Sequence, residues 1–123
     1  MKTFTLDEAN ALIPHILKLL DELTETRNKL STLGANLSSI LEHASGNGGS
    51  KAGSEYAMEL QSFNAQLSLF QDLGCELKDL DQGLVDFPSQ RGEKQIYLCW
   101  KRGEPRVQFW HDVDSGMAGR QPI

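Results

Sequence analysis

Apolar residues recur every seven positions through the first third of the chain. The row comprises Ala9, Ile16, Leu23, Leu30 and Leu37, and further apolar residues flank it on both sides. This period is typical of an amphipathic α-helix, and the stripe is broader than a two-position coiled-coil seam. The pattern therefore predicts a long helix whose apolar face is covered by the rest of the chain or by a second copy.

Residues near the N-terminus indicate where this helix begins. Thr5 and Glu8 have the spacing of a capping box, in which each side chain bonds the backbone amide of the other. Pro14 removes one helical hydrogen bond and disfavours helix at the residue before it. We therefore expect a short first helix, a kink or break near Pro14, and a long helix to about residue 44.

A second helix is predicted after a connector rich in small residues. Residues 45–54 contain mostly glycine and serine, which predicts a flexible loop, more simply a plain helix connector than a mobile lid. Residues 55–73 have helical apolar spacing and would form the antiparallel partner of the first helix. Gly74 suits the helix end, although residues 75–80 fit either a strand or a continuing helix.

The last third of the chain has the alternation of β-strands. Hairpin-length connections join its runs, so residues 75–111 predict a three- or four-stranded antiparallel meander, followed by an irregular tail at residues 112–123. Helices in one half and strands in the other indicate a single α+β domain, with the helical hairpin packed on the sheet. The predicted strands are residues 84–88, 95–100 and 106–111.

Apolar matching suggests how the last two strands pair. With Trp100 opposite Val107, the apolar residues of both strands coincide, and Cys99 and His111 point to opposite faces. This register argues against a metal pair formed by Cys99 and His111. Cys99 then reads as a small buried apolar residue.

Net charge and composition exclude several classes of protein. The 123 residues carry a net charge of −5, divided into −7 over residues 1–89 and +2 over residues 90–123. An acidic chain is a poor candidate for nucleic-acid or anionic-membrane binding. No apolar run is long enough to span a bilayer. Two cysteines and an N-terminus with Asp7 and Glu8 in place of a signal sequence predict a cytoplasmic protein.

Functional groups gather in the β half without forming a recognised motif. No metal or cofactor is expected, although Cys99, His111 and Asp86 are ligand types used by zinc or iron. Asp86 lies between apolar residues and needs a partner such as Arg102, Arg120 or backbone amides. His111 reads either as a ligand or acid–base group or as a histidine bonded to backbone. The candidate ligand-binding residues are Asp86, Trp100, Glu104, Trp110, His111, Asp112 and Arg120.

Short motifs along the chain resemble a known family. They are Glu8-Ala9-Asn10, Gly83 to Pro88, Leu98-Cys99-Trp100, Gly103-Glu104, Trp110-His111 and Gly119-Arg120. Together they resemble the DUF2203 family of small bacterial proteins over nearly the whole chain. The resemblance implies no mechanism, because the family is one of unknown function.

Two functions are compatible with these features. The first is a non-enzymatic binding or assembly module, which self-associates as a dimer through the helical hairpin and recognises a partner with its aromatic C-terminal face. The second is a small enzyme or metal-dependent ligand binder with a site around Asp86, Glu104, His111 and Arg120. The basic residues of the last quarter would suit a small anionic ligand. We expect no membrane or nucleic-acid partner.

Overall fold

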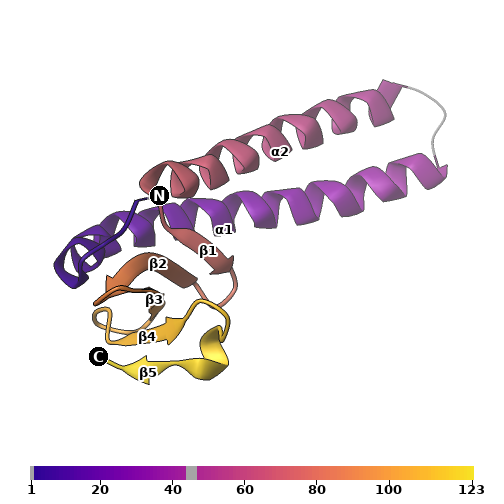
Figure 1. The fold of residues 1–123 in the computed structure, drawn as a ribbon. Coiled ribbons are helices and arrows are strands. Elements are labelled where there is room, and N and C mark those ends of the chain that lie inside the picture. Colours follow the sequence, from indigo (N-terminus) through magenta and orange to yellow (C-terminus); the bar gives the residue numbers. More distant parts are fainter. Residues whose placement is uncertain (1, 44–46) are drawn as a thin grey trace. The chain divides into compact units, whose positions relative to one another are not determined.

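The fold combines two helices with an antiparallel sheet. A computed structural model describes residues 2–43 and 47–123, with the side chains of residues 2–39 and 51–123. Two long helices precede five strands in the order β1-β2-β3-β4-β5 (Figure 1). The predicted α+β class is confirmed, but the sheet has five strands rather than three or four. The chain divides into two compact units, Met1–Leu20 with Leu69–Ile123, and Asp21–Ser68.

Helix α1 spans Leu6–His43 without interruption. The capping box forms as predicted: the Thr5 amide donates to Oε1 of Glu8 at 2.9 Å, and the Glu8 amide to Oγ1 of Thr5 at 3.1 Å. The predicted division into a short and a long helix is wrong, because Pro14 lies inside α1. Pro14 is exposed, so water can bond the carbonyl of Asn10 that loses its helical donor.

Helix α2 spans Asn47–Leu73, which corrects the expected connector. Of the predicted loop 45–54, Ser45 and Gly46 lie outside the described residues, and the remainder is helical. Once a helix is nucleated, each added residue gains a hydrogen bond, which offsets the poor helix propensity of glycine. The predicted end is confirmed: Gly74 has φ +92°, and its amide donates to the carbonyl of Phe70 at 3.2 Å.

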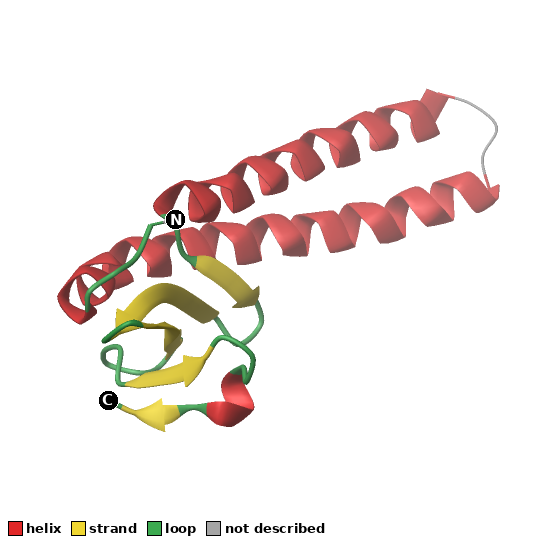
Figure 2. Ribbon diagram, viewed as in Figure 1, coloured by secondary structure: helices red, strands yellow, loops and turns green. Residues whose placement is uncertain are grey.

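The sheet extends further along the chain than predicted. Residues after Gly74 form a strand rather than more helix, and the tail is not wholly irregular. It contains a short 3-10 helix, η1, and a final strand paired with β4 (Figure 2). The tail is held because the Ile123 amide donates to the carbonyl of Gln108 at 2.9 Å. The elements are β1 Glu76–Asp79, β2 Leu84–Arg91, β3 Lys94–Lys101, β4 Phe109–Asp112, η1 Met117–Gly119 and β5 Gln121–Pro122.

Strand β2 continues through Pro88, where the predicted strand ended. In an antiparallel strand, the N–H and C=O of one residue point to the same side. The Pro88 carbonyl accepts from the Phe4 amide at 2.7 Å and therefore faces away from β3. The backbone nitrogen of Pro88, which carries no hydrogen, faces the same way. The proline therefore removes no bond of the β2–β3 ladder.

The pairing of β3 with β4 differs by one residue from the predicted register. Cys99 lies opposite Phe109, whereas the predicted pairing places Trp100 opposite Val107. The last predicted strand, residues 106–111, corresponds to β4, which starts three residues later than expected, at Phe109. The predicted register was therefore wrong.

A long-range hydrogen bond explains the difference. The Val107 amide donates to Oδ1 of Asn10 in α1 at 2.7 Å, so Val107 belongs to the connection and not to the strand. Side chains alternate between the two faces of a sheet. A shift of one residue in the pairing of β3 with β4 therefore changes whether two given side chains lie on the same face or on opposite faces. Cys99 and His111 therefore lie on the same face of the sheet.

The first unit, Met1–Leu20 with Leu69–Ile123, has its core on the other face of the sheet. The apolar face of early α1 and the end of α2 contribute to this core, and Phe4 packs edge-on against Phe87 with 5.4 Å between ring centres. Burial on this scale is the main source of stability for a small domain. Its buried apolar side chains include Ile16, Leu20, Phe70, Val85, Phe87, Leu98 and Trp100.

The second unit, Asp21–Ser68, consists of the remaining parts of the two helices. A Cβ atom on Gly34 would lie 3.5 Å from Cε2 of Tyr56, so the helices approach closely there. Buried Thr26 satisfies its hydroxyl by donating to the Glu22 carbonyl at 3.0 Å. Farther along, Leu33, Leu37 and Phe63 are only half-buried. Neither helix has a described stretch long and apolar enough to cross a membrane.

Candidate functional site

Three side chains with metal-ligand chemistry meet on the face of the sheet opposite the apolar core. They are Asp86 on β2, Cys99 on β3 and His111 on β4, and one ligand atom of each lies within 4.8 Å of the other two. Asp86 and Cys99 are directly opposite each other in the β2–β3 ladder. Their exposed fractions are 3%, 0% and 2%, so the cluster is buried.

The hydrogen bonds of His111 determine which ring nitrogen faces the cluster. Nδ1 lies 2.8 Å from the backbone oxygen of Asp112, and Nε2 lies 3.0 Å from Oδ2 of Asp86. The backbone oxygen can only accept, so Nδ1 carries hydrogen. Nε2 is therefore directed at Asp86 and can either share a proton with its carboxylate or offer a lone pair to a metal ion.

Asp86 has one oxygen that the protein leaves without a partner. Oδ1 is buried and meets no hydrogen-bond geometry within the described part of the chain, and the nearest donor to this carboxylate besides His111 is the Cys99 thiol. A buried carboxylate oxygen without a partner is costly, and it is a recurrent mark of a ligand or ion site.

The Cys99 thiol lies between Asp86 and the guanidinium group of Arg120. Burial raises the pKa of the Cys99 thiol to about 12, the Asp86 carboxylate adds to the rise, and Arg120 opposes it. The thiol is therefore protonated at neutral pH unless a cation displaces its proton.

A second polar pair lies beside this cluster. Nη2 of Arg120 donates to Oε1 of Glu104 at 2.6 Å and to the Cys99 carbonyl at 3.3 Å, and the guanidinium lies 4.2 Å from the Phe109 ring centre. Glu104 also accepts from the Lys101 amide at 2.6 Å. The pair therefore holds the C-terminal tail against the turn after β3.

These contacts correct some of the predicted roles. The partner observed for Asp86 is His111, which was not among the expected partners Arg102, Arg120 and backbone amides. His111 bonds to backbone through Nδ1, as one of its two predicted roles requires, and its Nε2 faces the Asp86 carboxylate. Arg120 pairs within the chain with Glu104.

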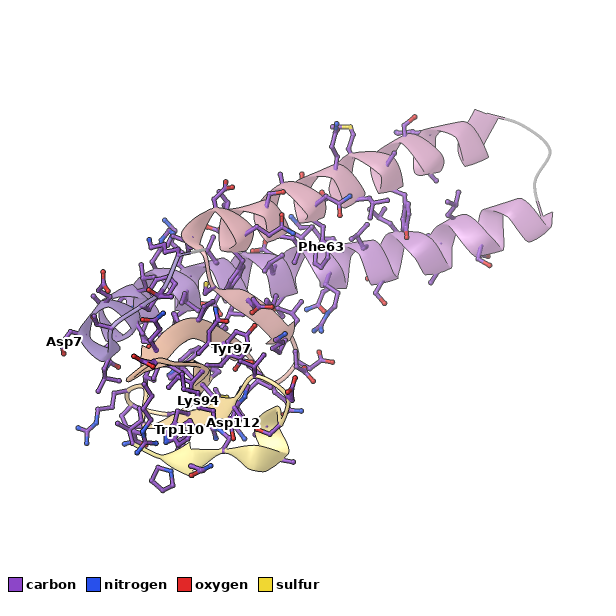
Figure 3. All side chains as sticks on the ribbon, in the orientation of Figure 1. Asp7, Phe63, Lys94, Tyr97, Trp110 and Asp112 are labelled. Carbon is purple, nitrogen blue, oxygen red and sulfur yellow. The ribbon has the colours of Figure 1, made fainter. Side chains whose placement is uncertain are left out.

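The other predicted residues lie on the opposite face or at its edge. Trp100 is 1% exposed and donates its indole N–H to the Glu104 carbonyl at 3.1 Å, so it is a core residue. Arg91 stacks on Trp110 at 4.3 Å. The Asp112 side chain pairs with Lys94 at 2.5 Å, as their adjacent positions in Figure 3 show. Trp100, Trp110 and Asp112 therefore do not join the cluster.

A cavity of about 260 Å³ adjoins the cluster. Asp86 and His111 form part of its wall, whereas Cys99 does not. The rest of the wall comes from β1, β2, β3 and the tail. Lys78, Tyr97 and Met117 were not predicted as site residues, because only the tail's return over the sheet brings them together. The other lining residues are Leu84, Val113 and Gly116.

A larger cavity of about 570 Å³ lies near the N-terminal segment. Its wall includes Phe4, Glu8, Arg91 and Trp110, but none of the clustered ligands. Glu8 is already engaged in the capping box. We therefore assign the functional chemistry to the smaller cavity.

Comparisons with known proteins give one result. Residues 2–123 match the family model described as an uncharacterised conserved protein, DUF2203. Neither a curated protein nor a solved structure matches the chain significantly.

Proposed function

Since the chain belongs to the DUF2203 family, which is described as uncharacterised, we propose from the geometry of its site that it is a zinc-binding module rather than an enzyme. The observation that carries this proposal is the buried cluster of Asp86, Cys99 and His111, whose ligand atoms lie within 4.8 Å of one another. We place the module in the cytosol, because its two cysteines are free thiols.

The spacing of the three side chains suits a zinc ion. Bond lengths of about 2.0 to 2.3 Å in a tetrahedral site separate ligand atoms by roughly 3.3 to 3.7 Å. The cluster's atoms already lie within 4.8 Å of one another, so the longest separation needs to shrink by only about 1 Å.

The chemistry of the donor set also favours a divalent ion. Thiolate, imidazole and carboxylate are ligands of zinc and iron, and the histidine is oriented by a bond from its other nitrogen to backbone. A divalent ion with one thiolate and one carboxylate leaves these groups without net charge, which a buried site requires. The ion would bind Oδ1 of Asp86, or it would take the place of the hydrogen bond between Oδ2 of Asp86 and His111.

Binding is favoured over catalysis by the same residues. A nucleophilic cysteine needs a lowered pKa and access to solvent, whereas Cys99 has a raised pKa and is fully buried. Among the described residues lining the cavity, the carboxylate and the histidine are Asp86 and His111, and a bound metal ion would engage both groups.

Metal analysis of purified variants tests the proposal. Protein stripped with a chelator, dialysed against zinc and analysed by mass spectrometry should retain about one zinc per chain. The Cys99→Ser and His111→Gln variants should bind at least about 100-fold more weakly, since loss of an outer partner alone costs roughly 10- to 100-fold. Cys75→Ser and His15→Gln are matched controls outside the cluster and should bind normally. Equal retention by all five proteins would contradict the proposal.

A second function, self-association, is favoured by the helical unit Asp21–Ser68. On α2, Leu60 is 41% exposed, and Met58, on another side of the helix, is 68% exposed. Two helices alone leave such a surface partly in water, and a second copy of the chain would cover it. We therefore propose a homodimer formed through the helices.

Light scattering tests this dimer. The wild-type chain should have twice the monomer mass at high micromolar concentration, and Leu60→Glu should shift it toward the monomer. Gln61→Glu adds a charge at a neighbouring exposed position and should have little effect. A wild-type monomer at that concentration would exclude the dimer without affecting the metal site.

A further inference from the structure

We propose that the cavity beside the cluster binds a small aliphatic carboxylic acid, whose carboxylate occupies the fourth coordination position of the metal. This inference rests on the proposed zinc site and adds the chemical class of its ligand. It is carried by three features of the cavity, namely its access to the cluster, its single cationic side chain and its apolar wall.

The cavity reaches the cluster at Asp86 and His111. The described residues supply three ligands, whereas zinc takes four in a tetrahedral site. Asp86 and His111 line the cavity and Cys99 does not. An external ligand can therefore approach the cluster from the side of Asp86 and His111, and zinc sites with three protein ligands hold an exchangeable group in the fourth position.

Lys78 supplies a positive charge at the cavity. Among the described lining residues, it is the only cationic side chain. Its ammonium lies 3.2 Å from Oε1 of Glu76 and 5.8 Å above the Tyr97 ring. The side chains of Lys78 and Glu76 are 43% and 42% exposed, so their ion pair is weak and can yield to a ligand carboxylate.

The remaining wall selects a ligand with an apolar body. Leu84, Val113 and Met117 contribute it, and Val113 is 48% exposed, so a ligand can reach its side chain. Covering these groups with a hydrocarbon chain would remove apolar surface from water. An acid with a short alkyl chain therefore fits better than an inorganic anion.

The volume of the cavity limits the size of the ligand. About 260 Å³ equals the share of roughly nine water molecules in the liquid. An acid of about four to eight non-hydrogen atoms fills this space. Butyrate is therefore the probe of choice, and acetate tests the role of the alkyl chain.

Cobalt substitution separates metal binding from ligand binding. The full chain loaded with Co²⁺ should show the intense visible bands of a four-coordinate thiolate site. Butyrate should then change these bands in a saturable manner, and acetate should do so more weakly. n-Butanol has the same alkyl chain without a charge, and phosphate has charge without an alkyl chain, so both should leave the spectrum unchanged at the same concentrations.

Variants of the cavity wall test its individual contributions. Lys78→Gln should weaken butyrate binding about threefold or more while the cobalt spectrum without butyrate is preserved. Lys94→Gln is the matched control, because Lys94 pairs with Asp112 outside this cavity. Met117→Gln should weaken butyrate more than acetate.

The outcomes test the metal site and the carboxylate ligand separately. A cobalt spectrum that neither butyrate nor acetate changes would overturn the carboxylate inference and leave the metal site intact. Phosphate binding as tight as butyrate binding would replace the inferred acid with a general anion and overturn it as well. Failure of the wild-type chain to give a cobalt spectrum would remove the metal site itself, and the inference with it.

Discussion

Nε2 of His111 lies 3.0 Å from Oδ2 of Asp86, between two strands that are not neighbours in the sheet. Strand β3 separates them and places Cys99 beside both. The contact exists because β3 and β4 pair in the observed register, which directs Cys99 and His111 to one face. Three side chains on three paired strands are positioned more precisely than side chains on loops, which suits a metal site.

The amide of Val107 is the first place to test this register. Asn10→Ala removes its acceptor and leaves a part-buried N–H unsatisfied, which should lower the free energy of unfolding by about 1 to 3 kcal/mol. Asn28→Ala, at an exposed position of the same helix, should be neutral or slightly stabilising. Denaturant titration of the two variants measures the difference, and an equal stability of both would contradict the role of Asn10.

The pair formed by Arg120 and Glu104 should be strongly coupled. Arg120→Met should cost about 2 kcal/mol of unfolding free energy, because Glu104 remains part-buried without its cation. The double variant with Glu104→Gln should cost less than the sum of the single variants, by roughly 1 kcal/mol. Strict additivity in urea titrations would show that the pair does not hold the tail.

Gly119 tests the packing of the tail over the site. A Cβ atom at this position would lie 2.5 Å from Cβ of Ser115, so Gly119→Ala should destabilise the protein by roughly 1 to 3 kcal/mol. Adding Ser115→Gly should recover part of the loss. Gly53→Ala is the control, since nothing lies near that helical position, and it should stabilise by about 0.5 to 1 kcal/mol. Thermal unfolding measures all three, and a neutral Gly119→Ala would refute this tail geometry.

Cys75 should make stability depend on pH in the alkaline range. Burial raises the pKa of its thiol from 9.0 to about 11, so the unfolded chain loses this proton at lower pH than the folded chain. The contribution is present below pH 9 and is lost as pH rises toward 11. Between pH 8 and 10, wild type should lose about 1 kcal/mol more unfolding free energy than Cys75→Ala. Parallel profiles for the two proteins would contradict this assignment.

Local features of the fold were predictable from neighbouring residues. The capping box at Thr5 and Glu8 and the helix end at Gly74 depend on side chains within one turn, and both form as expected. The α+β class follows from periodicity alone. The uninterrupted helix through Pro14 was not predictable, because the outcome depends on the exposure of that turn in the folded chain.

Features that depend on distant residues could not be predicted in this way. The register of β4 depends on a bond between Asn10 and Val107, which are 97 positions apart. Apolar matching favoured the neighbouring register, which separates Cys99 from His111. The candidate residues were therefore largely identified, but their grouping was not. Asp86 and His111 were grouped with Glu104 and Arg120, whereas the structure adds Cys99 to the first pair.

X-ray absorption at the zinc edge tests the central claim most directly. The zinc-loaded wild-type chain should show one sulfur neighbour at about 2.3 Å and nitrogen or oxygen neighbours at about 2.0 to 2.2 Å. The sulfur contribution should disappear in any zinc retained by Cys99→Ser and should persist in Cys75→Ser. A zinc ion surrounded only by nitrogen and oxygen in the wild-type chain, or no bound zinc, would contradict the account.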